Sequence, residues 1–243
     1  MLFQTSHREI ASLHVSNRSC SYFPSDLPDQ IEQAAKEVRN DGCIRAVLLV
    51  GGDDVFSYGS DLSDHAREQE LADASPYYEV LPQLLLSFPV PTVAAMQGHA
   101  ISGGLALGAC CTTMVLAEEK LYGMNFVEIG IPAVMGTTTI FDSVFGSTVA
   151  RAMLFDGALR TGRELAEHSP SIQSLVKPAN DVIEHAMHLA WQFTLSERST
   201  CTILNNSLNS SRREKVTRTL EVEREMIRMH RTKQHTKHSK NEL

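Results

Sequence analysis

Two glycine-containing turns, each following an apolar run, offer main-chain N–H groups that could bind an oxygen atom. The first comprises residues 97–108 (QGHAISGGLALG), which follow the apolar run 90–96 and lead into a further apolar segment, an order typical of strand, turn and helix. Glycine admits a ligand close to the backbone because it has no Cβ, and the first N–H groups of a helix have no partner within it. The turn can therefore hold an oxyanion or a phosphate, or it can be a tight turn without a ligand.

A second segment nearer the N-terminus has the same organisation. Residues 46–52 (AVLLVGG) are typical of a buried strand that ends in glycines, and residues 53–62 (DDVFSYGSDL) form a glycine-containing loop after it. A single unpaired N–H at a strand end is common in α/β proteins. Two such strand ends, if they converge, could place two donors on one oxygen atom.

These segments resemble motifs of the crotonase superfamily, also called the enoyl-CoA hydratase/isomerase family. Residues 56–62 (FSYGSDL) are similar to the family's F-(S/C)-x-G-(A/G)-D-(L/I) loop, and residues 88–104 are similar to its (F/K/R)-P-(V/T)-(I/V)-A-A-(V/I)-x-G-x-(A/C)-x-G-G-G stretch. Residues 155–167 resemble its later x-G-x-x-x-x-A-x-E-A segment. The resemblance implies an α/β fold, a crotonase-like spiral of ββα units with a C-terminal helical region.

The resemblance also implies a catalytic oxyanion hole formed by the main-chain N–H groups of Ser60 and Gly103, with Gly104 beside them at the substrate. The two donors would bind the thioester carbonyl of an acyl-CoA or of an acyl group on an acyl carrier protein. Enolate charge develops on that oxygen, and loss of one preorganised donor typically raises the barrier by about 3–4 kcal/mol. Because the donor is main chain, a serine at position 60, where the family has Ala or Gly, leaves it intact.

The two glutamates with which hydratases of this family move protons are absent. Their positions are occupied by Ala106 and Phe126. A positioned acid or base contributes about 10²–10⁴-fold to a rate. An ordinary enoyl-CoA hydratase is therefore the least favoured function.

A subgroup is indicated by residues 122–138 (YGMNFVEIGIPAVMGTT). They resemble the segment Y-x-x-N-F-M-x-Y-G-F-T-P-G-M-G-A-T of hydratase-like decarboxylases from polyketide β-branching. Those enzymes remove CO₂ from 3-methylglutaconyl groups on an acyl carrier protein and give 3-methylcrotonyl-type products. The resemblance implies that Asn125, Phe126 and Gly136 contact the substrate.

Residues 220–234 resemble the same subgroup's E-x-E-(M/I)-H-x-x-T-F helix, and its histidine is placed at His230. In the implied reaction, the substrate's own carboxylate leaves as CO₂ while the N–H groups of Ser60 and Gly103 hold the dienolate oxygen. His230 would then return a proton to carbon, because imidazole exchanges protons near neutral pH. His230 can also be a solvated residue on a charged helix.

The decarboxylases carry a lysine about two helical turns after the first oxyanion residue, suited to holding the substrate carboxylate, and Glu68 stands at the matching position here. Arg67 could supply the cation because a guanidinium pairs well with a carboxylate, although Asp64 and Glu68 would oppose it. Three interpretations stay open. Arg67 replaces the lysine, with Asp64 also near the substrate; or the substrate differs; or the segment is a polar surface loop.

Glu128 suggests a second function. It lies two residues from one of the lost glutamate positions, and as a base in the pocket it would suit an isomerase of the same fold that moves a double bond; His230 could serve the same purpose. Glu128 can also be a surface residue. A non-catalytic scaffold is the third hypothesis, which the lost glutamates and lysine favour and the intact glycine turn disfavours.

The composition favours a cytoplasmic protein without a cofactor. Among 243 residues with net charge −7, the five cysteines lack the spacing of metal ligands and are expected to be buried thiols. Residues 1–8 are short and polar, so we do not expect them to act as a signal peptide, and no apolar run reaches the roughly 20 residues that span a membrane. Basic residues dominate 212–240, which could steer an acidic acyl carrier protein; no nucleic acid is expected, because glutamates interrupt this run and aromatic residues are absent from it.

Periodicity predicts strands and helices in the order of an α/β spiral followed by helices. Strands are expected at 10–15, 46–50, 92–96, 113–117 and 120–124, and helices at 77–87, 137–145, 181–196 and 199–235, the last with a polar break near 205–211. We expect a ββα-spiral core at 1–190, a helical region at 191–235 that covers the active site, and a disordered tail at 236–243. The resemblance implies a homotrimer.

Overall fold

The computed structural model describes residues 3–16, 21–61, 76–169 and 176–241. The strands are β1 (Phe3–His7), β2 (Ile10–His14), β3 (Ala46–Val50), β4 (Val55–Ser57), β5 (Thr92–Met96), β6 (His99–Ile101), β7 (Thr113–Ala117), β8 (Leu121–Gly123), β9 (Arg160–Thr161) and β10 (Val176–Lys177). The helices are α1 (Leu27–Asn40), α3 (Pro76–Leu85), α4 (Gly103–Ala109), α5 (Thr137–Phe145), α6 (Ser147–Asp156), α7 (Gly162–His168), α8 (Ala179–Thr194) and α9 (Arg198–Asn241).

Two sheets run through the described residues. The larger has the order β1-β2-β3-β5-β7-β10 and is parallel except between β1 and β2; the smaller has the order β4-β6-β8-β9 and is antiparallel only between β8 and β9. Three times, a strand of the larger sheet is followed directly by one of the smaller sheet: β3 by β4, β5 by β6, and β7 by β8. Helix α4 follows β6 and helix α5 follows β8, which is the repeating ββα order that the sequence predicted.

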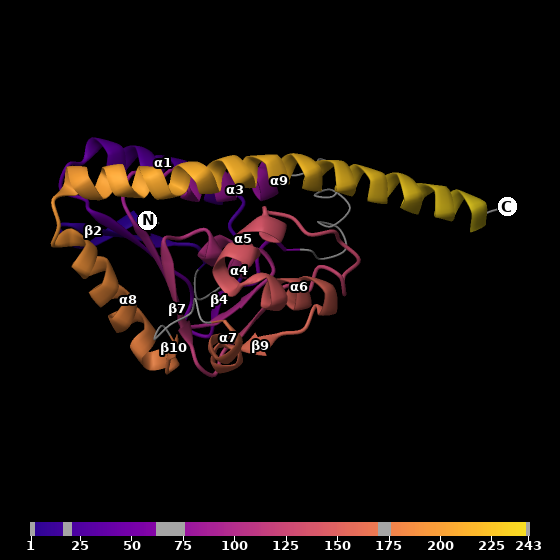
Figure 1. The fold of residues 1–243 in the computed structure, drawn as a ribbon, viewed down its shortest axis with the longest axis horizontal. Coiled ribbons are helices and arrows are strands. Elements are labelled where there is room, and N and C mark those ends of the chain that lie inside the picture. The colour runs from indigo at the N-terminus through magenta and orange to yellow at the C-terminus, as the bar shows by residue number, and fades with distance from the viewer. Residues whose placement is uncertain (1–2, 17–20, 62–75, 170–175, 242–243) are drawn as a thin grey trace.

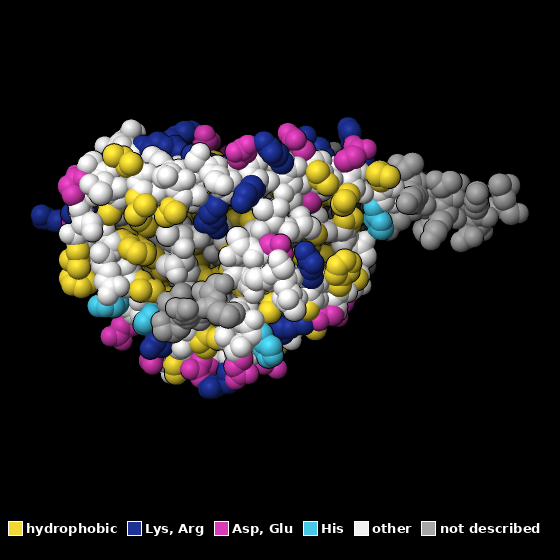
Figure 2. Space-filling model, viewed as in Figure 1, with side chains coloured by type: hydrophobic (Ala, Val, Ile, Leu, Met, Phe, Trp, Pro, Cys, Tyr) yellow, Lys and Arg dark blue, Asp and Glu magenta, His cyan; other side chains and the backbone are white. Residues whose placement is uncertain are grey.

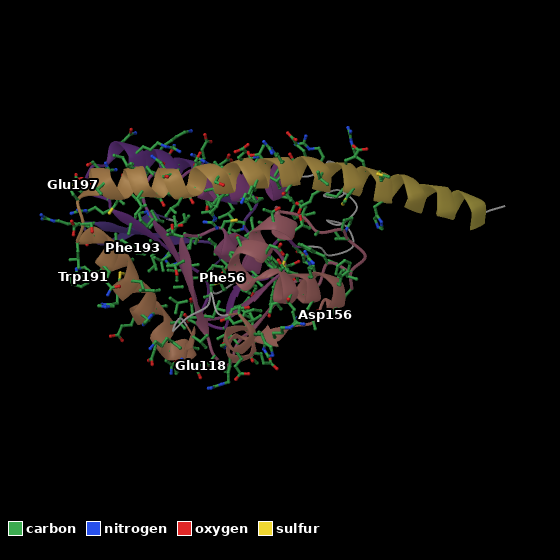
Figure 3. The ribbon with its side chains drawn as sticks, in the orientation of Figure 1. Phe56, Glu118, Asp156, Trp191, Phe193 and Glu197 are labelled. Carbon is green, nitrogen blue, oxygen red and sulfur yellow. The ribbon has the colours of Figure 1, made fainter. Side chains whose placement is uncertain are left out.

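The core lies on both faces of the larger sheet, so β3 and β5 are buried along their whole length. On one face, Val182, Ala186 and Ala190 recur every four residues of α8 and pack with Leu48 of β3. The other face forms a cluster with residues of α1, α4 and α5, and it includes the fully buried Phe56 of β4, seen near the middle of the molecule in Figure 3. The continuous apolar runs thus mark strands covered by helices on both sides.

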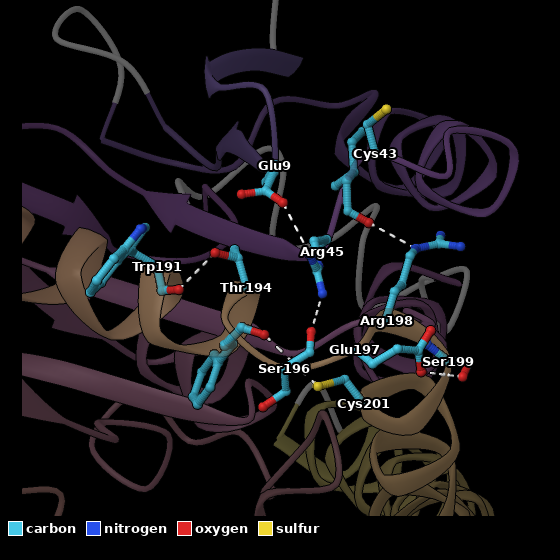
Figure 4. A network of polar contacts seen from close by, with 12 residues as sticks. Glu9, Cys43, Arg45, Trp191, Thr194, Ser196, Glu197, Arg198, Ser199 and Cys201 are labelled. Atoms are coloured by element: carbon cyan, nitrogen blue, oxygen red, sulfur yellow. Dashed lines mark hydrogen bonds and ion pairs between the residues drawn. The ribbon is translucent and has the colours of Figure 1, made fainter.

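Helix α9 is anchored at its start to the last turns of α1 and to the segment after it, where Arg198 donates from Nε to the carbonyl of Ile44 at 3.1 Å (Figure 4). The Glu197 carboxylate accepts hydrogen bonds from the N–H groups of Ser199 and Thr200, at 3.0 and 2.9 Å, and thereby caps the helix. Hydrogen bonds from Ser199, and then from Thr200, lower the pKa of Glu197 to about 2. Arg198 donates from Nη2 to the carbonyl of Val38 in the last turns of α1, at 2.9 Å. These contacts fix the direction in which α9 leaves α8.

From this anchor α9 runs past α3 and α5 and projects beyond the rest of the protein at its C-terminal end (Figure 1). The predicted polar break near 205–211 is wrong, because the helix is continuous there. Asn205 is buried and donates from Nδ2 to the carbonyl of Phe88 at 2.8 Å, while Asn209 donates to Asn205 Oδ1 at 3.3 Å. These polar residues face the body of the protein and hold the helix to it.

Basic and acidic side chains are interspersed along the edge where α1 and α9 lie (Figure 2). Arg218 pairs with Glu214 at 2.6 Å, and Arg224 donates from Nε to Glu79 of α3 at 2.6 Å. The described part of the predicted basic segment therefore carries carboxylate partners as well as cations. No described helix combines the length and the apolar character that crossing a bilayer requires.

Candidate active site

The two predicted turns meet because the strands before them are neighbours. β4 and β6 pair in parallel, with Val55 opposite His99 and Ser57 opposite Ala100, so their carboxyl ends lie at the same edge of the smaller sheet. A Cβ built on Gly59, whose φ is +84°, would lie 2.8 Å from the main-chain nitrogen of Gly103. The two loops are therefore in direct backbone contact, and a glycine is required where they cross.

Gly104 makes a second close approach between the same two loops. A Cβ on Gly104 would lie 2.0 Å from the carbonyl oxygen of Ser57, a distance that no side chain tolerates. The Ser57 side chain in turn accepts a hydrogen bond from the N–H of Gly59 at 3.0 Å. The contact thus fixes α4 on the end of β4.

The N–H groups of Ser60 and Gly103 have the properties of available donors. Within the described segments of the chain, neither N–H donates a hydrogen bond to a protein acceptor. Gly103 is the first residue of α4 and is buried, whereas Ser60 is half-buried. Two N–H groups on adjacent loops, without a partner in the part of the chain that the structure describes, are what an oxyanion hole requires, because a buried N–H without a partner is costly unless a ligand completes it.

Ser102 immediately precedes Gly103 and has a strained backbone, with φ 57° and ψ −125°. Its N–H donates to the carbonyl of Gly123 at 2.9 Å, which extends the pairing of β6 with β8. Its Oγ is buried and has no hydrogen-bond partner among the described residues. A residue with a Cβ in this conformation costs about 1–3 kcal/mol, a strain typical of functional turns. Ser102 occupies the first position of the family's glycine triplet, so the sequence carried a signal for this strain.

An apolar wall lies against Gly103. A Cβ built on Gly103 would be 3.1 Å from Cε2 of Phe23 and 3.3 Å from Sδ of Met135. Met135 and Gly136 form a turn in which both have positive φ, 62° and 71°. Low polarity next to Gly103 strengthens any hydrogen bond that its N–H donates to a developing negative charge.

Glu223 is a buried carboxylic acid on α9 that was not predicted from the sequence. Its Oε2 accepts a hydrogen bond from the N–H of Gly136 at 2.8 Å, and its Oε1 accepts one from Oγ1 of Thr138 at 3.2 Å. Burial raises the pKa of Glu223 to about 7, although these hydrogen bonds act to lower it. The helix around Glu223 is rich in exposed glutamates, so the sequence alone contains no signal that singles it out.

Three residues predicted to contact the substrate lie on the segment after β8: Asn125, Phe126 and Glu128. Asn125 is half-buried, and its Oδ1 is buried with no partner among the described residues. Phe126 is buried. Glu128 is exposed and its side chain lies over Gly157, with Cγ 2.9 Å from the position of a Cβ there. Glu128 thus packs on the end of α6.

Other predicted residues lie further away or outside the described residues. His230 is half-buried on α9, and as the seventh residue after Glu223 it lies about 10 Å further along the helix axis. Asp64, Arg67 and the neighbouring Glu68 fall in the segment 62–75, outside the described residues. Their proposed contacts stay predictions.

The described residues contain no cluster of three or more His, Cys, Asp or Glu side chains that could hold a metal ion. Cys110 and Cys111 at the end of α4 are fully buried, and burial raises the pKa of each thiol to about 12. Neither thiol is a ready nucleophile.

The chain is similar to known proteins over most of its length. The sequence model of the family described as Enoyl-CoA hydratase/isomerase matches residues 7–242. Bacillaene synthase decarboxylase PksI of Bacillus subtilis (strain 168) is 28% identical over 205 residues, which are 83% of this chain and 80% of that protein. A putative enoyl-CoA hydratase of Thermus thermophilus is 32% identical over 163 residues, which are 65% of this chain and 63% of that protein.

Two solved structures superimpose on the chain with a TM-score of 0.83. One belongs to a dehydratase/decarboxylase enzyme couple involved in polyketide β-branching, is 27% identical, and covers 92% of this chain and 88% of its own. The other is the ECH2 decarboxylase domain of CurF from Lyngbya majuscula, which is 26% identical and covers 93% of this chain and 92% of its own. These similarities confirm the predicted crotonase fold and the predicted likeness to decarboxylases of polyketide β-branching.

Proposed function

Because the chain belongs to the enoyl-CoA hydratase/isomerase family, we propose that it decarboxylates a 3-methylglutaconyl-type thioester carried by an acyl carrier protein. The observation that carries the proposal is the pair of N–H groups at Ser60 and Gly103, which have no acceptor among the described residues and lie on loops in direct contact. Ala106 and Phe126 stand where a hydratase would need its two glutamates, and both are buried. An oxyanion site without those carboxylates suits a reaction that starts without an enzyme base.

In the proposed reaction, the bond between the substrate's carboxylate and its γ-carbon breaks, and the electron pair flows through the C=C bond into the thioester carbonyl. The N–H groups of Ser60 and Gly103 stabilise the resulting dienolate oxygen, at about 3–4 kcal/mol per donor. The apolar contacts of Phe23 and Met135 with Gly103 would strengthen the hydrogen bond that the N–H of Gly103 donates.

Protonation of carbon completes the reaction, and His230 is the proposed acid. It is carried by α9, the helix that reaches the Met135–Gly136 turn through Glu223. An imidazolium that has given up its proton regains one from water near neutral pH, so the enzyme returns to its starting state.

Two contacts are proposed for the carboxylate that leaves. Arg67 would pair with it in place of the family's lysine, while the side-chain NH₂ group of Asn125 would orient it as a hydrogen-bond donor.

The described structure supports decarboxylation over an isomerase that uses Glu128. That isomerase requires the Glu128 carboxylate to face the thioester, and the side chain instead lies over Gly157 at the end of α6. The proposed partner is an acidic acyl carrier protein, steered by cations of α9, and the proposed assembly is a homotrimer. The mass of the protein in solution, measured by light scattering after gel filtration, tests the assembly.

The proposed activity is tested by loading a carrier protein with a 3-methylglutaconyl group and following its mass after addition of the enzyme. We expect loss of one CO₂ and formation of a 3-methylcrotonyl-type product. A matched control carries the saturated 3-methylglutaryl group, which should keep its carboxylate because no C=C bond connects it to the thioester. Double-bond migration in a 3-methylcrotonyl thioester without CO₂ loss from the first substrate would overturn the proposal in favour of an isomerase, and inactivity with both would favour a scaffold.

A further inference from the structure

Helix α9 contacts the turn beside the candidate oxyanion hole through a buried carboxyl group. Glu223 is only 3% exposed, and its two oxygens accept hydrogen bonds from the N–H of Gly136 and the hydroxyl of Thr138. Gly136 caps the start of α5, and the N-terminus of a helix favours a negative charge. The carboxyl group is therefore buried, lies at the N-terminus of α5, and contacts a turn whose residues have positive φ.

Apolar and polar contacts on either side of Glu223 make this a defined interface between α5 and α9, which lie side by side (Figure 1). One turn earlier on α9, Thr219 and Thr139 share a hydrogen bond of 2.6 Å between their hydroxyl oxygens. Val216 is buried, and a Cβ on Gly136 would lie 3.0 Å from its Cγ1. The turn thus has little room to move while α9 is docked.

The same turn reaches the candidate oxyanion hole through Met135. Its sulfur lies 3.3 Å from the position of a Cβ on Gly103, and Met135 is itself buried with φ 62°. A displacement of Gly136 would therefore move the side chain that packs on Gly103. The connection runs from Glu223 through Gly136 and Met135 to the N–H donor of Gly103.

A buried carboxylate is a costly way to join two helices. Its removal from water disfavours the charged form, and apolar residues usually fill such a position at no loss of stability. Its neighbours on α9 are exposed, and Arg224 pairs with Glu79 of α3. Asp142 of α5 is exposed and accepts a hydrogen bond from Ser147. Among the described residues, Glu223 accepts hydrogen bonds from the N–H of Gly136 and the hydroxyl of Thr138, which are both neutral, so its role is to bind main-chain and hydroxyl donors rather than to neutralise a cation.

We propose that Glu223 is a positioning residue, which holds the Met135–Gly136 turn against Gly103 and so makes the oxyanion-binding geometry depend on the docking of α9. This inference rests on the proposed function only in its activity test, because the reaction measured there is the proposed decarboxylation. Glu223 itself makes no contact with substrate in this proposal. Catalytic power would then require both the glycine turns of the core and the C-terminal helix.

The variants Glu223→Ala and Glu223→Gln test this role, with the exposed neighbour Glu221→Gln as the matched control. Alanine removes both acceptors, while glutamine keeps one oxygen for the N–H of Gly136 and presents an amide to Thr138. Hydrogen exchange of the intact protein, followed by mass spectrometry, should show faster exchange in residues 134–140 and in α4 for Glu223→Ala, by about tenfold for one lost hydrogen bond. Glu223→Gln should be intermediate, and Glu221→Gln should match the wild type.

Activity provides the second readout. We expect kcat to fall by about 10–100-fold in Glu223→Ala with a small change in KM, because misplacement of a donor affects the transition state more than substrate binding. Partial recovery in Glu223→Gln would follow its remaining acceptor. Unchanged exchange in α4 together with an unchanged kcat in Glu223→Ala would overturn the inference even if the wild type is an active decarboxylase. If the wild type has no decarboxylase activity, the exchange of α4 still decides whether Glu223 positions it.

Discussion

Gly59 and Gly103 are in backbone contact, although α3, β5 and β6 lie between them in the sequence. The position of a Cβ on Gly59 is 2.8 Å from the nitrogen of Gly103, the atom that carries one of the two proposed oxyanion donors. Any side chain at position 59 must therefore displace that donor. This relationship makes the oxyanion hole testable even though its N–H groups belong to the main chain.

The variant Gly59→Ala should be almost inactive. The added methyl group meets the nitrogen and Cα of Gly103 and opens the gap between the two loops. A shift of this kind typically costs about 10²-fold in rate, and complete loss of one donor about 10²–10³-fold in kcat. Steady-state decarboxylation of the carrier-bound substrate measures the loss.

Gly146→Ala is the matched control for this change. Gly146 also has a positive φ, 79°, but a Cβ there would have no atom within 4 Å. Both variants should lose stability from backbone strain, on the order of 1–3 kcal/mol, and Gly146→Ala should keep its kcat. Equal activity of the two variants would mean that Gly103 does not need its present position.

Ser102 should limit the stability of the protein. Ser102→Gly removes the Cβ from a residue with φ 57°, so we expect the free energy of unfolding to rise by about 1–2 kcal/mol. Ser102→Ala keeps the strain but removes a buried hydroxyl that has no partner in the described part of the chain, and it should give a gain of about 1 kcal/mol. Urea denaturation measures both values. A loss of stability in both variants would show that the hydroxyl is hydrogen-bonded and that the strain is absent in solution.

Glu223 should make stability depend on pH. Its folded pKa of about 7 lies above its ordinary 4.5, so the folded state binds the proton more tightly. The stabilisation from this proton is complete below about pH 4.5 and is lost as the pH rises through about 7. Relative to Glu223→Gln, the wild type should therefore lose about 1–3 kcal/mol between about pH 5 and pH 8, since one pKa unit corresponds to about 1.4 kcal/mol.

Denaturation curves of the two proteins across this pH range measure the difference. Other titrating groups are common to both proteins, so they cancel in the comparison. The exposed Glu221→Gln variant should follow the wild type at every pH. Parallel stability profiles for the wild type and Glu223→Gln would contradict the burial of an ionisable carboxyl group at this position.

The local signals in the sequence were sufficient for the elements that carry the proposed donors. A strand followed by a glycine turn defined the loops at Ser60 and Gly103, and α5 begins and ends at the predicted residues, 137 and 145. The short strands β4 and β6 were not predicted as separate elements, because three residues carry too little periodicity. Their pairing is nevertheless what brings the two turns together.

Residues whose role depends on contacts between distant elements could not be found in this way. Glu221, Glu223 and Glu225 look alike in the sequence, and only the packing of α9 on α5 buries the middle one. The role of Asn205 likewise depends on a distant contact. It belongs to the polar segment for which a break in α9 was predicted, but its side chain donates to the carbonyl of Phe88 and holds the helix in place. A polar residue on a long helix can therefore be exposed to solvent or can hold the helix to the protein, and the packing of the helix decides which.

His230→Ala should suppress product formation and leave the fold intact. The side chain of His230 is half-buried on α9 and lies outside the core, so its removal creates no core cavity. If the imidazole returns the proton to carbon, its loss should lower kcat by about 10²–10⁴-fold, the usual contribution of a positioned acid. His188→Ala on α8, an exposed histidine beside Trp191, is the matched control and should behave as the wild type. Identical rates in the wild type and in His230→Ala would remove His230 from the mechanism.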